Sequence, residues 1–250
     1  MASATLPSAE VPERSNSFAR IFGVLFSPKA TFQSIVRQPT WIVPIILSCL
    51  VFLGTVGLFG HRGGWPSYFE KQLASNNRFQ ELPKDQQQRT LAAELKYGPP
   101  VAYVEGVIAP VVGALVMAAI LLGLFKGLAG AQFGFKTSLG IVAYAWIPNL
   151  ISGLLGILII AVKDPATVDL QNVVASNASI FVSGDSARWL IALLGAIDIF
   201  SFWVMILLAM GYSAAAPKKL STGKAFAWIF SAWLIYVLAK VGLLAAFASA

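Results

Sequence analysis

The stretch WIVPIILSCLVFLGTVGLFG, residues 41–60, decides the fold of this chain. It contains no Asp, Glu, Lys, Arg or His, and the nearest such residues on either side are Arg37 and His61. A helix needs about 20 predominantly apolar residues to cross the hydrocarbon core of a bilayer. The stretch therefore predicts a first transmembrane span over residues 41–60.

The composition of the whole chain points to the same class of protein. Of its 250 residues, 57% are hydrophobic and 12% are charged, whereas soluble domains average roughly 45–50% apolar and about 25% charged residues. So few charges cannot cover the surface of a soluble fold of this length, and the chain is predicted to be an integral membrane protein. The net charge of +7 indicates basic cytoplasmic loops and attraction to anionic lipids rather than binding to nucleic acid.

Four more apolar stretches predict an all-α, polytopic fold with five transmembrane helices. The further spans are expected at 99–125, 138–162, 188–213 and 225–247. Five spans leave the two ends of the chain on opposite sides of the bilayer. The short loops 126–137 and 213–224 together hold five Lys and no acidic residue, so the positive-inside rule predicts that these loops and the N-terminus are cytoplasmic.

The segment before the first span predicts a broken amphipathic helix that lies in the cytoplasmic interface. Its aromatic anchor side chains are Phe18, Phe22, Phe26 and Phe32. The first three share one helix face, and Ser27-Pro28 restarts the helix, because serine caps helices and proline suits the first helical position. We expect the apolar face to enter the bilayer, with Arg20, Lys29 and Arg37 directed toward the lipid headgroups. A helix packed on the cytoplasmic face is the alternative.

Two more segments outside the spans have an expected structure. Residues 1–17 lack an apolar segment and are expected to form a disordered tail, so that residues 18–250 make up one membrane domain. The polar loop 61–98 predicts a small helical cap on the outer side, with a short helix near 66–76 and a longer one after it. Gly98-Pro99-Pro100 is expected to end the longer helix before the next span begins.

Three ionisable residues lie inside predicted spans, where charges are costly and mark candidate functional positions. Counting about 1.5 Å per residue from the span ends, Glu105, Asp198 and Lys240 all fall in the outer half of the bilayer, where they are able to form one cluster. One interpretation is a structural Asp198–Lys240 ion pair that holds two spans together. A second is a proton- or ion-coupled site with Glu105 or Asp198 as the titrating carboxylate. In a third, Glu105 and Lys240 extend separately to the outer interface.

Pro148 and Asn149 interrupt the middle of the third predicted span. Proline removes one backbone hydrogen bond and kinks a helix, which frees a carbonyl group. The amide of Asn149 is able to bond such a group or a neighbouring helix; simple packing at a kink is the alternative.

Signals for enzymatic chemistry are absent from the sequence. The chain has one cysteine, Cys49, and one histidine, His61, which excludes an intrachain disulfide and a zinc site of paired Cys or His ligands. No nucleotide-binding, hydrolase or metalloprotease motif is present, so neither catalytic residues nor a cofactor or metal are expected. The polar segment 163–188 is interpreted as a re-entrant or surface loop without chemistry of its own.

Several short motifs, in their order along the chain, resemble the Yip1-domain family in its bacterial form. They are FSPKATFQSI (26–35), RQPTWIVPIIL (37–47), ELPKDQQQ (81–88), Tyr144-Ala-Trp-Ile-Pro148 and Ile197-Asp198-Ile199-Phe200. The resemblance covers roughly residues 18–247. It implies an amphipathic lead-in, five spans and a helical loop after the first span. Eukaryotic relatives are membrane adaptors linked to small GTPases and vesicle shaping, but their Asp-Leu-x-Gly-Pro element is absent here, which argues against a GTPase partner.

Two function hypotheses follow. The leading one is a non-enzymatic, multi-pass membrane protein of the Yip1 type with an adaptor or membrane-organising role in the bacterial cytoplasmic (inner) membrane. Its expected partners are the bilayer, including anionic lipids, and a protein partner or a second copy of the chain. The competing hypothesis is a small proton- or ion-coupled transporter or channel built on Glu105, Asp198 and Lys240.

Overall fold

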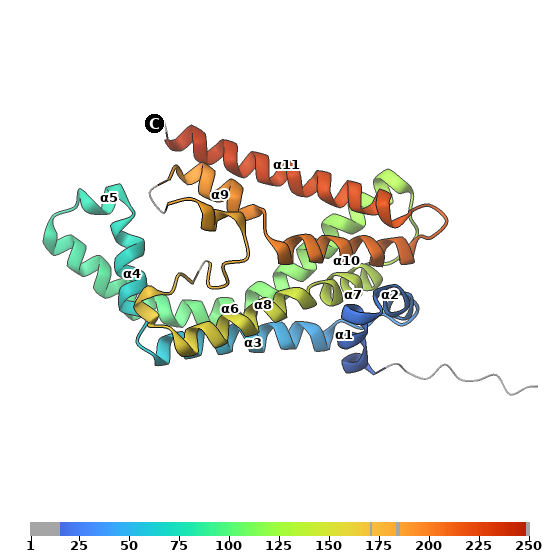
Figure 1. Ribbon diagram of the computed structural model, residues 1–250, viewed down its shortest axis with the longest axis horizontal. Coiled ribbons are helices and arrows are strands. Elements are labelled where there is room, and N and C mark those ends of the chain that lie inside the picture. Colours follow the sequence, from blue (N-terminus) through green and yellow to red (C-terminus); the bar gives the residue numbers. More distant parts are fainter. Residues whose placement is uncertain (1–15, 171, 184–185, 249–250) are drawn as a thin grey trace, which may run out of the picture.

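The computed structural model describes residues 16–170, 172–183 and 186–248, so the tail expected at residues 1–17 lies almost entirely outside the described residues. The described part is built from helices and loops, without a β-strand (Figure 1). The α-helices are α1 (Ser17–Phe26), α2 (Pro28–Arg37), α3 (Ile42–His61), α4 (Trp65–Ala74), α5 (Asn77–Gln80), α6 (Lys84–Ala129), α7 (Phe135–Ala145), α8 (Ile147–Val162), α9 (Arg188–Ala196), α10 (Ile199–Ala215) and α11 (Thr222–Ala248). Two short 3₁₀ helices, η1 (Pro165–Thr167) and η2 (Ala178–Phe181), lie between α8 and α9.

Four helical stretches in the described residues are long and apolar enough to cross a membrane, which confirms the predicted membrane fold. They are α3, α6, α7 together with α8, and α11. The kink predicted at Pro148 is present as a break between α7 and α8, with Pro148 in the first turn of α8. The span predicted at 188–213 is not one helix: it is divided into α9 and α10 at Ile197 and Asp198.

α6 runs without interruption through Pro99 and Pro100, so the helix end predicted at Gly98-Pro99-Pro100 is wrong. Each proline removes one backbone donor, but α6 packs on α4 at Gly98 and on α3 at Gly106. These contacts on both sides hold the helix continuous. At 46 residues, α6 is ~69 Å long, more than twice the ~30 Å of a hydrocarbon core, so its first part extends beyond the bilayer.

The packing of α4 on the first part of α6 depends on the absence of a side chain at Gly98. A Cβ atom there would lie 2.2 Å from Cζ of the buried Phe69 on α4. Gly98→Ala is therefore expected to lower the free energy of unfolding by roughly 1–3 kcal/mol through overpacking, measured by chemical unfolding in detergent. Gly127→Ala on the same helix is the control, because an added Cβ meets no atom within 4 Å there. Equal behaviour of the two variants would show that α4 does not pack on α6 as described.

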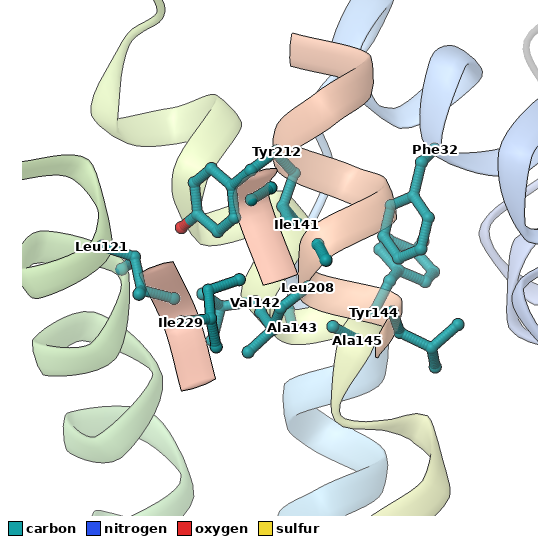
Figure 2. Packing of buried hydrophobic residues seen from close by; sticks show 14 of the residues in the cluster. Phe32, Leu121, Ile141, Val142, Ala143, Tyr144, Ala145, Leu208, Tyr212 and Ile229 are labelled. Carbon is teal, nitrogen blue, oxygen red and sulfur yellow. The ribbon is translucent and has the colours of Figure 1, made fainter. Parts of the chain in front are cut away.

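The main core lies at the end of the bundle that carries α1 and α2. α7 is its centre, with every residue from Ser138 to Ala145 buried among side chains of α2, α6 and α10 (Figure 2). The Ser138 hydroxyl donates to the Ala118 carbonyl at 2.7 Å and lies 2.6 Å from the Tyr212 hydroxyl. This end is thus tightly packed, whereas the cavities described below lie toward the other end.

Candidate functional site

α1 and α2 form a tight helical hairpin across one end of the bundle. Figure 1 shows α1 crosswise to the spans and α2 nearly end-on. The chain turns at Ser27, whose N–H donates to the Gly23 carbonyl at 2.7 Å, and Pro28 begins α2. The Ser27 side chain makes no capping hydrogen bond, so this detail of the prediction is wrong. Instead, the Thr31 hydroxyl donates to the Ser27 carbonyl at 2.9 Å.

Arg20 connects the two helices of the hairpin from the inside. Its side chain is only 3% exposed, and its Nη1 donates to the Gln38 carbonyl at 2.8 Å and to Thr40 Oγ1 at 2.9 Å. Its Nη2 donates to Ser34 Oγ at 3.0 Å. The prediction that Arg20 reaches the lipid headgroups is therefore wrong. The planar guanidinium binds several acceptors around the end of α2 at once, which a lysine ammonium cannot reproduce.

Tyr144 and Phe32 attach this hairpin to the core. The Tyr144 side chain of α7 is fully buried, and its hydroxyl lies 3.1 Å from Thr40 Oγ1 and donates to the Ser17 carbonyl at 3.4 Å. Phe32, expected among the lipid-anchoring side chains, is instead fully buried. Its ring packs against α10 at Gly211, where an added Cβ would lie 3.1 Å from Phe32 Cδ1. The hairpin is therefore part of the folded core.

Phe18, Phe22 and Phe26 form the outward face of α1, named here the phenylalanine ridge. Their side chains are 55%, 63% and 82% exposed. Arg20 and Val24, the buried residues of α1, occupy the opposite face of the helix. The ridge is thus an exposed apolar surface, and the hydrogen bonds of Arg20 on the opposite face of α1 fix the helix in place.

The second notable feature is the break between α9 and α10. Asp198 caps α10 there: its Oδ2 accepts from the Ser201 N–H at 2.8 Å, and its Oδ1 accepts from the Ser176 hydroxyl at 2.5 Å. The Ala178 N–H donates to the Ile197 carbonyl at 3.1 Å. The loop before α9 thus satisfies polar groups that the break exposes inside a predicted span.

A cavity of about 470 Å³ lies beside this break. Its polar lining consists of Thr55, Asn149, Ser152, Asn172, Ser176, Asn177, Asp198 and Ser201. Asn149 belongs to the sequence-predicted candidates and follows the break at Pro148. Asn172 and Asn177, joined by a hydrogen bond of 2.8 Å from Asn177 Nδ2 to Asn172 Oδ1, were missed, because segment 163–188 was interpreted as a loop without chemistry. Its unusual density of Asn, Asp and Ser between two spans was the available signal.

A second cavity of about 520 Å³ lies between α9 and α11. Asn172, Asn177, Gly195 and Ser201 line both cavities. The basic side chains of Arg188 and Lys240 line only the second one. The two cavities therefore share a wall but differ in charge.

The three intramembrane charges do not gather into one cluster. Asp198 lines the first cavity and Lys240 the second, while Glu105 lines neither and is exposed on α6. The oxygens of Asp198 bind Ser176 and Ser201 rather than Lys240, so the ion pair considered from the sequence is not formed. Among the described residues, no three His, Cys, Asp or Glu side chains come together to hold a metal.

These features fall on the motifs quoted from the sequence. Ser27-Pro28 forms the turn of the hairpin, Tyr144 supports α1, and Asp198 caps α10. A family model, the Yip1 domain, matches residues 22–244, nearly the whole chain. The chain belongs to the Yip1 family. No curated protein and no solved structure matches it.

The Yip1 match begins inside α1 and ends inside α11. The hairpin turn, the break at Asp198 and both cavities are therefore parts of the Yip1 domain itself. The Yip1 family is not known as enzymatic, and the membrane-spanning helices imply a lipid environment for the domain.

Proposed function

We propose that this Yip1-family protein is a non-enzymatic membrane organiser that inserts the phenylalanine ridge into the cytoplasmic leaflet of the bacterial inner membrane. The observation that carries the proposal is the ridge itself, three exposed phenylalanines on a short helix that lies crosswise to the spans at their ends. Amphipathic helices lie in the interface in this way, with the apolar face below the headgroups. The N-terminus is cytoplasmic in this proposal.

Insertion of the ridge is favourable and acts on one leaflet only. Full burial of a phenylalanine side chain contributes roughly 1.5–3 kcal/mol. Because Arg20 already holds α1 in place, little conformational freedom is lost on insertion. A helix that enters one leaflet without crossing the bilayer expands that leaflet and bends the membrane, while the spans keep the helix in position.

The same end of the protein offers a polar surface for an adaptor role. Lys29 and Arg37 of α2, the second helix of the same hairpin, are exposed. They fit anionic headgroups or an acidic partner segment at the cytoplasmic face. Together, the ridge and these cations would hold a partner at a bent membrane.

The double variant Phe22→Ser/Phe26→Ser is expected to abolish most of this effect. Each change removes about 2 kcal/mol of apolar insertion without touching the buried face of α1. The full chain is reconstituted into vesicles of phosphatidylethanolamine and phosphatidylglycerol, and vesicle diameter is measured by electron cryomicroscopy at rising protein-to-lipid ratio. The wild type narrows the vesicles, and the double variant leaves them close to the diameter of protein-free vesicles.

Phe181→Ser is the matched control, because Phe181 is 83% exposed on η2, far from α1 along the spans. It is expected to behave as the wild type. If the double variant also behaves as the wild type, the ridge has no role in membrane shape. Crosslinking in native membranes tests the proposed adaptor role. Loss of a captured partner protein in the double variant supports this role, and unchanged capture argues against it.

A small proton- or ion-coupled transporter or channel is the second candidate function. It is favoured by the polar cavity at the break between α9 and α10, since discontinuous helices form the ion and substrate sites of many transporters. Asp198 and Asn149 would then contact the transported species, whereas Glu105 lies outside the cavity. Ion or proton flux in proteoliposomes tests this candidate, and its absence under all imposed gradients would remove it.

A further inference from the structure

The cavity between α9 and α11 has a lining that the proposed function does not use. One group of lining side chains is charged: Asp169, Arg188 and Lys240. A second group is polar, with Asn172, Asn177 and Ser179, and a third is aromatic or aliphatic, with Trp233, Tyr236 and Val237. The two cations and one carboxylate leave one net positive charge on the wall. The combination of cation, hydrogen-bonding groups and apolar wall suits an amphiphile with a negative headgroup.

Successive turns of α11 place its cavity-lining side chains at different depths in the bilayer. Trp233, Tyr236 and Lys240 are spaced so that all three share one helix face. Lys240 lies eight residues before Ala248 (248 − 240), the last residue of α11, which corresponds to ~12 Å of helix. A long lysine side chain extends from such a depth toward the lipid headgroups. Trp233 and Tyr236 lie deeper, at the level of the glycerol and the acyl chains.

The two cations have donors available for a ligand. Arg188 Nη2 donates to the Ser75 carbonyl at 2.5 Å, but a guanidinium has five N–H donors. Lys240 is exposed and lines the cavity. Tyr236, which lines the cavity on the same face of α11 as Lys240, is 63% exposed, so the cavity is open to the surface of a helix that is long and apolar enough to span a membrane.

We propose that this cavity binds the headgroup of one anionic phospholipid from the leaflet on the α4 side of the protein. Lys240 and Arg188 hold the phosphate, and the amides of Asn172 and Asn177 bind headgroup hydroxyls. The acyl chains follow α11 past Trp233. This inference does not rest on the phenylalanine ridge, which lies at the opposite end of the spans.

The test measures binding of dioleoyl phosphatidylglycerol to the full chain in a neutral detergent, by native mass spectrometry during a lipid titration. Each change, Lys240→Gln or Arg188→Gln, is expected to weaken the tightest binding event about fivefold, because one basic residue near a membrane surface contributes about that factor. The double variant is expected to lose about 25-fold. Lys224→Gln, at the other end of α11, is the matched control and should bind as the wild type.

Gly195→Leu is a second variant that leaves all charges in place. An added Cβ at Gly195 meets no atom within 4 Å, and this residue lines the wall that the two cavities share, so a larger side chain there occupies cavity space. Loss of lipid binding in Gly195→Leu, with an unchanged unfolding midpoint, supports the proposal.

Three outcomes would overturn it. Equal binding of phosphatidylglycerol and phosphatidylethanolamine would show that the negative charge is not recognised. Equal losses in Lys240→Gln and Lys224→Gln would show a diffuse charge effect. Displacement of the lipid by millimolar inorganic phosphate, with phosphate bound at the same residues, would show a site for free phosphate rather than for lipid.

Discussion

Replacing Arg20 by methionine is expected to detach α1 from the bundle and to lower the free energy of unfolding by about 3 kcal/mol or more. Methionine keeps much of the side-chain bulk but removes the donors to Gln38, Thr40 and Ser34. Hydrogen bonds to a charged group contribute about 1.5–3 kcal/mol each, and acceptors left without a partner add a penalty. Chemical unfolding in detergent measures the loss, and hydrogen exchange over residues 17–26 reports the release of α1.

Arg20→Lys separates charge from geometry in this prediction. Lysine keeps the positive charge, but its single ammonium cannot reach all the acceptors that the guanidinium binds, so most of the stability is still lost. Lys29→Met, on the exposed surface of α2, is the control and should change stability by no more than about 0.5 kcal/mol. Stability and exchange equal to wild type in Arg20→Met would contradict the described anchoring of the hairpin.

Replacing Asp198 by alanine is expected to destabilise the protein by about 2–4 kcal/mol. The change removes the helix cap of α10, which contributes about 0.5–2 kcal/mol, and leaves the Ser176 hydroxyl without its carboxylate acceptor, at about 1.5–3 kcal/mol. Thermal and chemical unfolding in detergent measure the effect. Glu105→Ala is the control, since Glu105 is exposed on α6 and should be close to neutral.

Asp198→Asn distinguishes a structural role of this residue from a transport role. Asparagine caps helices as well as aspartate: its Oδ1 takes the place of the oxygen that accepts from the Ser201 N–H, and its Nδ2 donates to the Ser176 hydroxyl, so the expected loss of stability is below about 1 kcal/mol. A stable Asp198→Asn variant that loses a flux present in wild type would favour the transporter. A destabilisation of Asp198→Asn as large as that of Asp198→Ala would contradict the capping role described here.

The spans could be predicted from the sequence because a long apolar segment without charges is compatible with few structures other than a membrane-spanning helix. The positions at which helices end or are interrupted could not be predicted equally well. The two prolines at positions 99 and 100 resemble a helix end, but contacts of α6 with α4 and α3 keep the helix continuous. Conversely, the stretch around Asp198 is almost uniformly apolar, so its hydropathy predicts one helix. The break is marked instead by the capping residue Asp198 and its partner Ser176, 22 positions earlier.

The candidate sites were harder still to predict, because they depend on partners distant in sequence. The amphipathic pattern of α1 correctly groups Phe18, Phe22 and Phe26, yet it cannot distinguish an arginine that reaches headgroups from one that binds carbonyls, as Arg20 does. Periodicity likewise assigns Phe32 to the lipid-facing side, although α10 covers it. A loop that folds back between spans has no periodicity, which is why Asn172 was missed.

Measuring the depth of the phenylalanine ridge in the bilayer is the most direct test of its insertion into the membrane. Cys49 is the only cysteine, so Cys49→Ala gives a background in which single spin labels are placed by Phe22→Cys or, as the reference, by Lys29→Cys on the exposed face of α2. Power saturation in reconstituted vesicles then compares access of oxygen and of a water-soluble nickel complex. If the ridge is inserted, the label at position 22 is accessible to oxygen and protected from nickel, and the label at position 29 is accessible to nickel. Equal nickel access at the two positions would contradict insertion of the ridge.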